Sequence, residues 1–175
     1  MRFLEHLFKK QEPAKTGDSG ISSGYKAKSV YSPLAGTVIP LSEVEDPVFS
    51  QGVMGEGVGI RPDDGKLFAP VSGTIAALFP TCHAVGIQTE DGMEILLHIG
   101  IDTVELEGKG FQAAVKQGDT VKAGELLVTF DVAAIEAAGY KATTMVLVSN
   151  AASLGQMSQP KLGRVNPLEE LFSFE

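Results

Sequence analysis

The chain of 175 residues is 43% hydrophobic and 21% charged, with a formal net charge of −8 at pH 7. This composition is typical of a soluble protein with one globular domain, and the negative charge argues against a nucleic-acid partner, which requires a basic face. The single cysteine excludes an intrachain disulfide and favours the cytoplasm, and no apolar run approaches the roughly 18 residues of a membrane-spanning helix.

The N-terminal region divides into two predicted segments. Residues 1–10 combine apolar and cationic side chains so that, on a helix, the apolar ones fall on one face. We expect this segment to contact the inner face of the membrane weakly, with a disordered tail as the alternative. Residues 11–29 are polar and rich in Gly, Ser and Lys, which predicts a flexible linker before a folded domain at residues 30–175.

A seven-residue pattern occurs twice after the linker. Ser-Pro-Leu-Ala-Gly-Thr-Val at 32–38 and Ala-Pro-Val-Ser-Gly-Thr-Ile at 69–75 each place a proline before a Gly-Thr step into β-branched residues. No third copy follows, so a duplicated β-sandwich unit is favoured over a solenoid. Further short strands are predicted at 84–89, 93–99, 113–116, 125–130 and 143–149.

The second half of the chain adds one predicted helix, over residues 131–138. Asp131 is a suitable N-cap for it, and Gly139 is a suitable C-terminal end. In the last twenty residues Val165 indicates a closing strand, whereas residues 168–172 are compatible with a helix. The predicted fold is all-β: an antiparallel β-sandwich with internal duplication and one short helix.

The most informative segment is a predicted hairpin around Asp91-Gly92, the type of dipeptide that most strongly indicates a tight hairpin turn. If those two residues form the loop, Gly100 lies opposite His83. His83 and His98 then become diagonal neighbours on one face of the hairpin, with Cα atoms roughly 7–8 Å apart. A shift in register by one residue would put the two histidines on opposite faces.

This row of side chains suits phosphoryl chemistry. A neutral imidazole nitrogen is a nucleophile near pH 7 and can carry a phosphoryl group, while a second imidazole stabilises the phosphoryl oxygens during transfer. Thr81 and Asp102 extend the same row. The Asp102 carboxylate would repel phosphate if it pointed inward, so we expect it to orient a neighbour or shape partner contacts.

Two other interpretations of the histidine pair stay open. Histidines on a β-strand often have no chemical role. The pair could also bind zinc, but a zinc site needs at least three protein ligands. The spare candidates are Asp102 and Cys82, and Cys82 is expected on the opposite face, so a zinc hydrolase is the weakest hypothesis.

The run Leu-His-Ile-Gly-Ile-Asp-Thr-Val at 97–104, followed by Gly-Lys-Gly-Phe at 108–111, resembles a known phosphorylation-site motif. It is similar to that of the glucose-family IIA components of the bacterial phosphoenolpyruvate-dependent sugar phosphotransferase system. The resemblance covers about residues 30–150 and includes both copies of the repeat. It implies the fold of that family, a β-sandwich built as a duplicated hybrid motif, and a IIA phosphocarrier domain at 30–175.

The resemblance also implies roles for particular residues. His98 matches the phosphate acceptor, with its Nδ1–H held by a backbone carbonyl such as that of Gly100. His83 matches the second active-site histidine, whose ring is held by the hydroxyl of Thr81. An apolar rim on which partners dock corresponds to Val48, Phe49, Met54, Phe79 and Val104.

The implied function is that of a phosphotransferase component that needs no metal ion or cofactor. It would accept a phosphoryl group from phospho-HPr, which enzyme I phosphorylates, and transfer it to the cysteine of the IIB domain of a sugar permease. A IIA-like regulatory module, whose phosphorylation state controls other proteins, is the alternative from another functional class.

Overall fold

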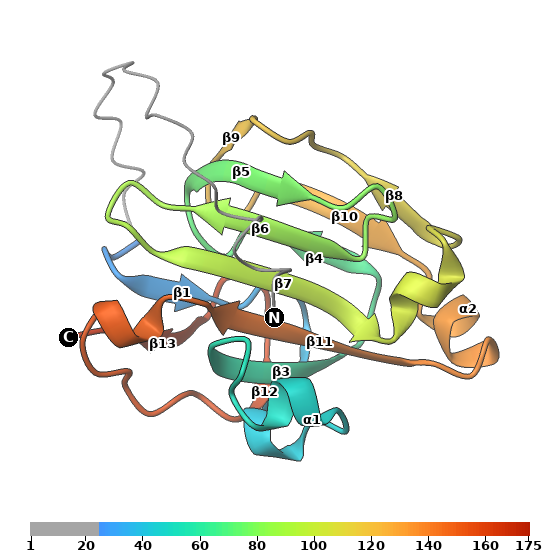
Figure 1. Ribbon diagram of the computed structural model, residues 1–175, viewed down its shortest axis with the longest axis horizontal. Helices are drawn as coiled ribbons and strands as arrows, with labels where there is room; N and C mark the ends of the chain where they lie inside the picture. Colours follow the sequence, from blue (N-terminus) through green and yellow to red (C-terminus); the bar gives the residue numbers. More distant parts are fainter. Residues whose placement is uncertain (1–24) are drawn as a thin grey trace.

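The computed structural model describes residues 25–175 (Figure 1). The predicted membrane-contact segment at 1–10 and residues 11–24 of the predicted linker lie outside the described residues. Within the described part of the chain, no helix is both long enough and apolar enough to cross a membrane.

The end of the predicted linker lies against the folded domain. The Tyr25 ring packs edge-on against the Tyr31 ring, with 4.8 Å between the ring centroids, and the Lys26 amide donates a hydrogen bond to the Tyr31 hydroxyl at 2.9 Å. The first strand then begins at Ser29. These contacts attach the chain to the domain a few residues before the first strand.

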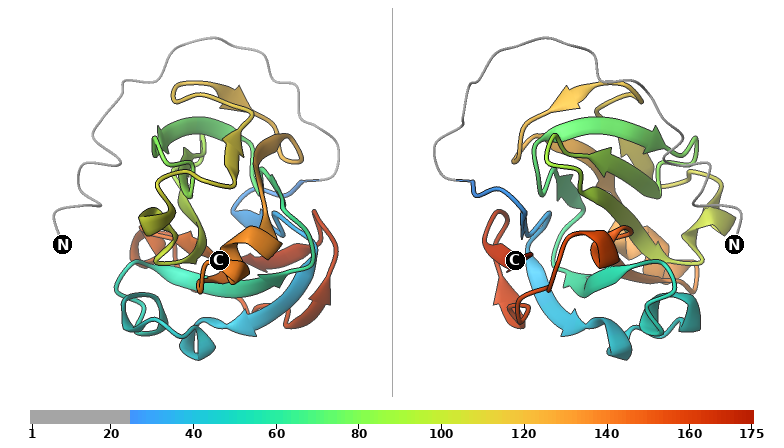
Figure 2. Two further views of the ribbon diagram at one scale, coloured as in Figure 1. Left: turned by 90° about the vertical axis from the view of Figure 1, so that its right-hand side faces the viewer. Right: turned by 60° about the vertical axis from the view of Figure 1, so that its left-hand side comes forward.

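The described residues form three antiparallel sheets, seen from three sides in Figures 1 and 2. The large sheet has the strand order β12 (Gly163–Val165), β2 (Gly36–Pro40), β3 (Glu56–Pro62), β11 (Lys141–Val148), β7 (Glu94–Ile101), β6 (Ala84–Gln88), β5 (Gly73–Leu78) and β9 (Thr120–Val121). A three-stranded sheet has the order β4 (Lys66–Phe68), β10 (Leu126–Phe130) and β8 (Phe111–Ala113). The remaining pair is β1 (Ser29–Tyr31) with β13 (Glu170–Ser173).

The large sheet is symmetric about its central pair, β11 and β7, with β3, β2 and β12 on one side and β6, β5 and β9 on the other. The two sequence repeats lead into β2 and β5, which occupy matching positions. Their glycines are required because a neighbouring strand approaches closely. A Cβ on Gly36 would lie 2.1 Å from the carbonyl oxygen of Arg61, and one on Gly73 would lie 2.4 Å from that of Gln88. The predicted antiparallel β-sandwich with internal duplication is confirmed.

Hydrophobic side chains fill both faces of the large sheet. The main core lies against the three-stranded sheet, where Leu67 and Leu127 pack with Ile60 and Leu97 of the large sheet, all fully buried. Burial of such a side chain contributes about 1.5–3 kcal/mol to folding. A second, smaller cluster covers the opposite face and consists of Ile39, Val44, Phe49, Leu96, Ile101, Met145 and Leu147.

As far as Ile99, the side chains of β7 alternate between the two clusters, as side chains do along a regular strand. Ile95, Leu97 and Ile99 belong to the main core, whereas Leu96 belongs to the second cluster. His98, two residues after Leu96, therefore faces the second cluster. The alternation of β7 thus places a histidine among apolar side chains on the outer face of the large sheet.

Two short α-helices occur among the described residues, one more than predicted. Helix α2 (Val132–Ala137) is the predicted one: the Asp131 carboxylate accepts a hydrogen bond from the Ala134 amide at 2.9 Å, and Gly139 follows with φ +92°. Helix α1 (Pro47–Ser50) was not predicted. Its signal was present, since Asp46 is the N-cap and proline occupies the first helical position.

Most predicted strands occur where expected, as β6, β7, β10 and β11. The strand predicted at 113–116 lies earlier, as β8, and ends at Ala113. The chain turns instead at Lys116, whose amide donates to the Asp119 carboxylate at 2.9 Å while the Asp119 amide donates to the Lys116 carbonyl at 3.1 Å. This Asp-closed turn replaces the end of the predicted strand.

The end of the chain is a strand and not the helix that residues 168–172 suggested. In β13, Phe172 pairs with Val30 and Ser173 pairs with Ser29, so the last strand closes on the first. Leu168 has φ +69°, in the left-handed region, which interrupts a right-handed helix at that point. The closing strand indicated by Val165 is present as β12.

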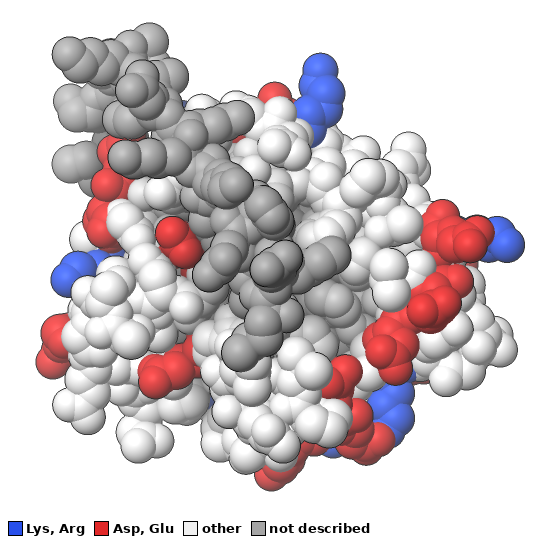
Figure 3. All heavy atoms as spheres, in the orientation of Figure 1, with Lys and Arg blue, Asp and Glu red and all other residues white. Residues whose placement is uncertain are grey.

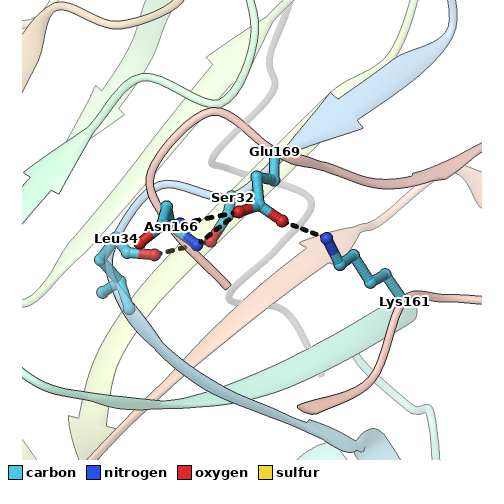
Figure 4. A network of polar contacts seen from close by, with 5 residues as sticks. All are labelled: Ser32, Leu34, Lys161, Asn166 and Glu169. Atoms are coloured by element: carbon cyan, nitrogen blue, oxygen red, sulfur yellow. Dashed lines mark hydrogen bonds and ion pairs between the residues drawn. The ribbon is translucent and has the colours of Figure 1, made fainter. Parts of the chain in front are cut away.

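A polar network ties this C-terminal segment to the first repeat (Figure 4). The Glu169 carboxylate accepts hydrogen bonds from the Asn166 side-chain amide at 2.9 Å and from the Lys161 ammonium group. The Ser32 amide donates to the Glu169 carbonyl at 2.8 Å, and the Ser32 hydroxyl donates to the Leu34 carbonyl at 2.7 Å. These bonds hold the C-terminal segment beside the start of the first repeat.

Candidate functional site

The rings of the two hairpin histidines lie next to each other. The ring centroids of His83 and His98 are 5.1 Å apart, and the rings lie nearly perpendicular, at 79°. His83 is buried, with 4% of its surface exposed, whereas His98 is only partly buried. The pair thus consists of one partly buried ring and one buried ring.

The register that brings the histidines together differs from the predicted one. Residue Thr89 pairs with Met93 through the Thr89 amide, so the hairpin loop has three residues and not two. Gly92 has φ +90°, the left-handed position that completes such a loop. As a result Ala84, and not Val85, lies opposite His98.

A one-residue shift was expected to separate the two histidines, and it does not. His83 lies in a bend just before β6, directly after Cys82, whose φ of +58° places it in the left-handed region. The strict alternation of a strand therefore does not govern the His83 side chain. The Ile99 amide still donates to the His83 carbonyl, at 2.7 Å, which keeps the bend against β7.

One hydrogen bond fixes each ring. The Nδ1 atom of His98 lies 2.8 Å from the carbonyl oxygen of Gly100, the contact that the sequence predicted. A carbonyl can only accept, so Nδ1 carries the proton and Nε2 keeps a lone pair. The Nδ1 atom of His83 lies 2.6 Å from the Thr81 hydroxyl, which can either donate or accept. The geometry therefore defines the tautomer of His98 and the orientation of His83.

A phenylalanine covers each ring. Phe49 of α1 lies 5.0 Å from the His98 ring, centroid to centroid, and Phe79, directly after β5, lies 5.3 Å from the His83 ring. On the strands beside His98, Ala84 and Met145 are its direct neighbours in β6 and β11. Met145 was not among the predicted site residues, because it reaches the site only through the pairing of β11 with β7.

The other predicted rim residues differ in exposure. Among the described residues, the exposed large hydrophobic side chains are those of Val48, Val53, Val104 and Leu162. Two of these, Val48 at 48% and Val104 at 49%, were predicted at the rim. Met54 is partly buried and packs against the second cluster, as a core residue does.

The carboxylate whose charge acts on His98 is that of Asp46. Asp46 caps α1 by accepting a hydrogen bond from the Val48 amide at 2.9 Å, and its charge partly opposes the lowering of the His98 pKa by burial. Asp102 is exposed, with φ +58°, and precedes the short helix η2 (Thr103–Leu106). The Asp-Pro pair in the sequence marks the start of α1, but it does not indicate that Asp46 lies near His98.

Acidic side chains lie along the lower and right-hand margins of the face in Figure 3, toward α1 and the region after β7, and others lie on its left-hand side. This distribution agrees with the net charge of −8. An acidic margin attracts a basic partner surface over distances up to about 8 Å at physiological ionic strength.

The two imidazoles are neutral at pH 7. Burial, together with the neighbouring His83 ring, lowers the pKa of His98 from 6.5 to about 4, against the opposing effects of the Gly100 carbonyl and the Asp46 carboxylate. Burial also lowers the pKa of His83. A neutral ring with its lone pair on Nε2 is a nucleophile.

We expect a titration followed by nuclear magnetic resonance to show His98 neutral down to about pH 5 and protonated near its pKa of about 4. In the unfolded chain the same ring should titrate near its ordinary pKa of 6.5. Between these values only the unfolded state binds the proton, so the His98 contribution to stability is complete above pH 6.5 and is lost as pH falls toward 4. A folded-state pKa near 6.5 would contradict the burial of the ring.

Within residues 25–175, no three His, Cys, Asp or Glu side chains gather in a way that could hold a metal ion. The Cys82 sulfur lies 3.7 Å from the Pro80 carbonyl oxygen, and the residue is partly exposed.

Comparisons with known proteins agree on one family. The family "phosphoenolpyruvate-dependent sugar phosphotransferase system, EIIA 1" matches residues 28–154. The glucose permease IIA from Mycoplasma capricolum matches in structure with a TM-score of 0.77 and 39% sequence identity, over 82% of this chain and 93% of that one.

Two curated relatives differ in how much of their own length this chain covers. The chain is 44% identical over 140 residues to the PTS system glucose-specific EIIA component of Oceanobacillus iheyensis. This match covers 80% of this chain and 85% of the relative. The chain is 49% identical over 144 residues to the PTS system beta-glucoside-specific EIIBCA component of Halalkalibacterium halodurans. This match covers 82% of this chain and 23% of the relative. The chain thus spans about a quarter of the length of the beta-glucoside-specific relatives that it matches.

Proposed function

The chain belongs to the EIIA 1 family of the phosphoenolpyruvate-dependent sugar phosphotransferase system, and we propose on that basis that it is a phosphocarrier. It accepts a phosphoryl group from phospho-HPr on Nε2 of His98 and transfers it to the cysteine of a sugar-specific IIB domain. The observation that carries this proposal is the hydrogen bond from His98 Nδ1 to the Gly100 carbonyl, 2.8 Å long. It leaves Nε2 free to attack, beside a second imidazole.

In the first step the Nε2 lone pair of His98 forms a bond to phosphorus while the phosphorus–nitrogen bond of the donor breaks, and its electron pair returns to the donor. In the second step the thiolate of IIB forms the sulfur–phosphorus bond and the electron pair of the broken bond returns to Nε2. The proton on Nδ1 stays in place through both steps, held by Gly100. Catalysis then depends on alignment and on balancing the phosphoryl charge.

His83 supplies the charge balance in this mechanism. Its ring lies 5.1 Å from that of His98, and the Thr81 hydroxyl at 2.6 Å fixes its orientation. A phosphoryl dianion on His98 raises the pKa of a neighbouring imidazole, so His83 becomes a proton-carrying donor once His98 is phosphorylated.

The apolar rim serves two purposes. Phe49 and Phe79 cover the rings and exclude water from a phosphorus–nitrogen bond that water would hydrolyse. Val48 and Val104, each about half exposed, provide apolar surface on which HPr and IIB dock in turn. The names of the EIIBCA relatives, in which IIB, IIC and IIA belong to one protein, support IIB of a permease as the acceptor.

Incubation of the chain with phosphoenolpyruvate, enzyme I and HPr tests the proposal. Mass spectrometry should show one phosphoryl adduct per chain, lost in acid and stable in base, as expected for a phosphohistidine. A matched reaction without HPr should give no adduct. A chain that stays unlabelled in the complete mixture would contradict the proposed function.

We also propose a cytoplasmic location with weak contact to the inner face of the membrane through residues 1–10, which lie outside the described residues. A cationic segment with apolar side chains on one helical face suits an interfacial anchor. We expect the full chain to co-sediment with vesicles that contain anionic lipid, and a chain without residues 1–10 to stay in solution. Equal sedimentation of the two chains would show that the segment is not an anchor.

A further inference from the structure

The reactivity of His98 depends on one backbone carbonyl, that of Gly100. If this carbonyl turned away, Nδ1 would lose its acceptor and the ring would exchange between its two tautomers. The tautomer with its proton on Nε2 has no lone pair there and cannot accept a phosphoryl group. Whatever holds the peptide of Gly100 in place therefore also controls the nucleophile.

Regular strand pairing does not hold this peptide. Along β11 and β7, Thr144 pairs with Ile99 and Lys141 pairs with Ile101, so the register shifts around Gly100. Gly100 itself has φ +79°, a conformation that disfavours any residue with a side chain. The carbonyl that fixes the tautomer thus belongs to an irregular point of the strand.

We propose that Thr103 is a positioning residue for phosphoryl transfer, which holds Ile99 and Gly100 so that the Gly100 carbonyl faces His98 Nδ1. The Thr103 side chain is fully buried. Its hydroxyl donates to the Ile99 carbonyl, and its methyl group lies so close to Gly100 that a Cβ built there would be 2.3 Å from it. The hydroxyl group therefore binds Ile99 and the methyl group packs against Gly100, the two residues that follow His98.

The same contacts reach the second histidine. The Ile99 amide donates to the His83 carbonyl at 2.7 Å, while the Ile99 carbonyl accepts from Thr103. The peptide groups on either side of Ile99 are thus fixed between the His83 bend and the start of η2. The expected effect of Thr103 on phosphoryl transfer rests on the proposed phosphocarrier function. Its effect on the His98 tautomer does not, since the tautomer can be measured in the unphosphorylated chain.

Two substitutions separate the hydroxyl from the methyl group. Thr103→Val keeps the shape and removes the hydroxyl, whereas Thr103→Ser keeps the hydroxyl. Thr89→Val is the matched control: Thr89 is also a buried threonine, it binds the Met93 amide at 2.9 Å, and it lies at the opposite end of the same hairpin. If Thr103→Val changed the His98 tautomer only by destabilising the fold, Thr89→Val should change it as well.

Long-range ¹H–¹⁵N spectra of the histidine rings report the tautomer of His98 directly. We expect a single Nδ1–H form in the parent chain, in Thr103→Ser and in Thr89→Val, and a mixture of tautomers in Thr103→Val. Acceptance of phosphate from HPr should slow in Thr103→Val by about 10- to 100-fold, the loss typical when a hydrogen-bond partner that orients a metal-binding histidine is removed. An unchanged His98 spectrum in folded Thr103→Val would overturn the proposal, whether or not the chain accepts phosphate.

If Thr103→Val does not fold, the parent chain supplies a second measurement. The Thr103 hydroxyl proton should be observable in slow exchange with water, because it is buried and bonded to the Ile99 carbonyl. It should stay so when His98 is phosphorylated. A rapidly exchanging hydroxyl in the unphosphorylated chain would contradict the positioning role.

Discussion

His98→Ala should abolish phosphoryl labelling by phosphoenolpyruvate, enzyme I and HPr while leaving the chain folded. The substitution removes the lone pair that attacks phosphorus, and no other side chain at the site has a nitrogen held in the same tautomer by a carbonyl. The domain should remain folded because His98 lies outside the main core, at a partly exposed position between Ala84 and Met145. We expect a change of less than about 2 kcal/mol in the free energy of unfolding.

The chain provides a matched control for this variant. It has three histidines, and the third, His6, belongs to the N-terminal segment. His6→Ala should therefore be labelled as fully as the parent chain, and thermal unfolding of all three proteins should show that each is folded. An acid-labile adduct on folded His98→Ala would move the acceptor to another residue.

His83→Gln should separate acceptance from donation. Glutamine retains a hydrogen-bond donor of similar reach but cannot take up a proton, so it cannot balance the charge of the phosphoryl group as it leaves for a thiolate. We expect acceptance from HPr within a few-fold of the parent rate, and transfer to IIB slowed by at least about 100-fold, as for the loss of a positioned acid–base group.

Single-turnover assays in both directions measure these two rates. Thr81→Val is a useful companion, because it leaves the His83 ring in place and removes only the hydroxyl that orients it. Its transfer to IIB should fall between that of the parent chain and that of His83→Gln. Undiminished transfer to IIB by His83→Gln, or complete loss of its labelling, would show that the role of His83 is different.

The fold was predictable where the pattern is local. Proline before a Gly-Thr step located β2 and β5, and Asp131 located the start of α2. The hairpin was located correctly but its register was not. Asp91-Gly92 indicated a two-residue loop, whereas the Thr89 amide pairs with the Met93 carbonyl and leaves three residues in the loop. The dipeptide locates the turn but does not fix the number of residues in the loop.

The site was predictable only in part, for a related reason. His83, His98 and Thr81 lie on one hairpin, so their proximity follows from the sequence even though the expected register was wrong. Asp46 and Met145 reach the site from α1 and β11, which long-range packing brings to β7. The closure of the domain by β13 on β1 depends in the same way on residues from opposite ends of the described chain. Such long-range contacts follow from the tertiary fold and not from any local motif.

The most direct test of the account is the position of the phosphoryl group on the ring. The chain, labelled with ¹⁵N in its histidines, is phosphorylated through enzyme I and HPr, and the ³¹P–¹⁵N coupling is measured. The account predicts one phosphohistidine, with phosphorus bonded to Nε2 of His98 and the proton retained on Nδ1, and loss of the signal when unphosphorylated IIB is added. Phosphorus on Nδ1 of His98, or on any nitrogen of His83, would contradict it.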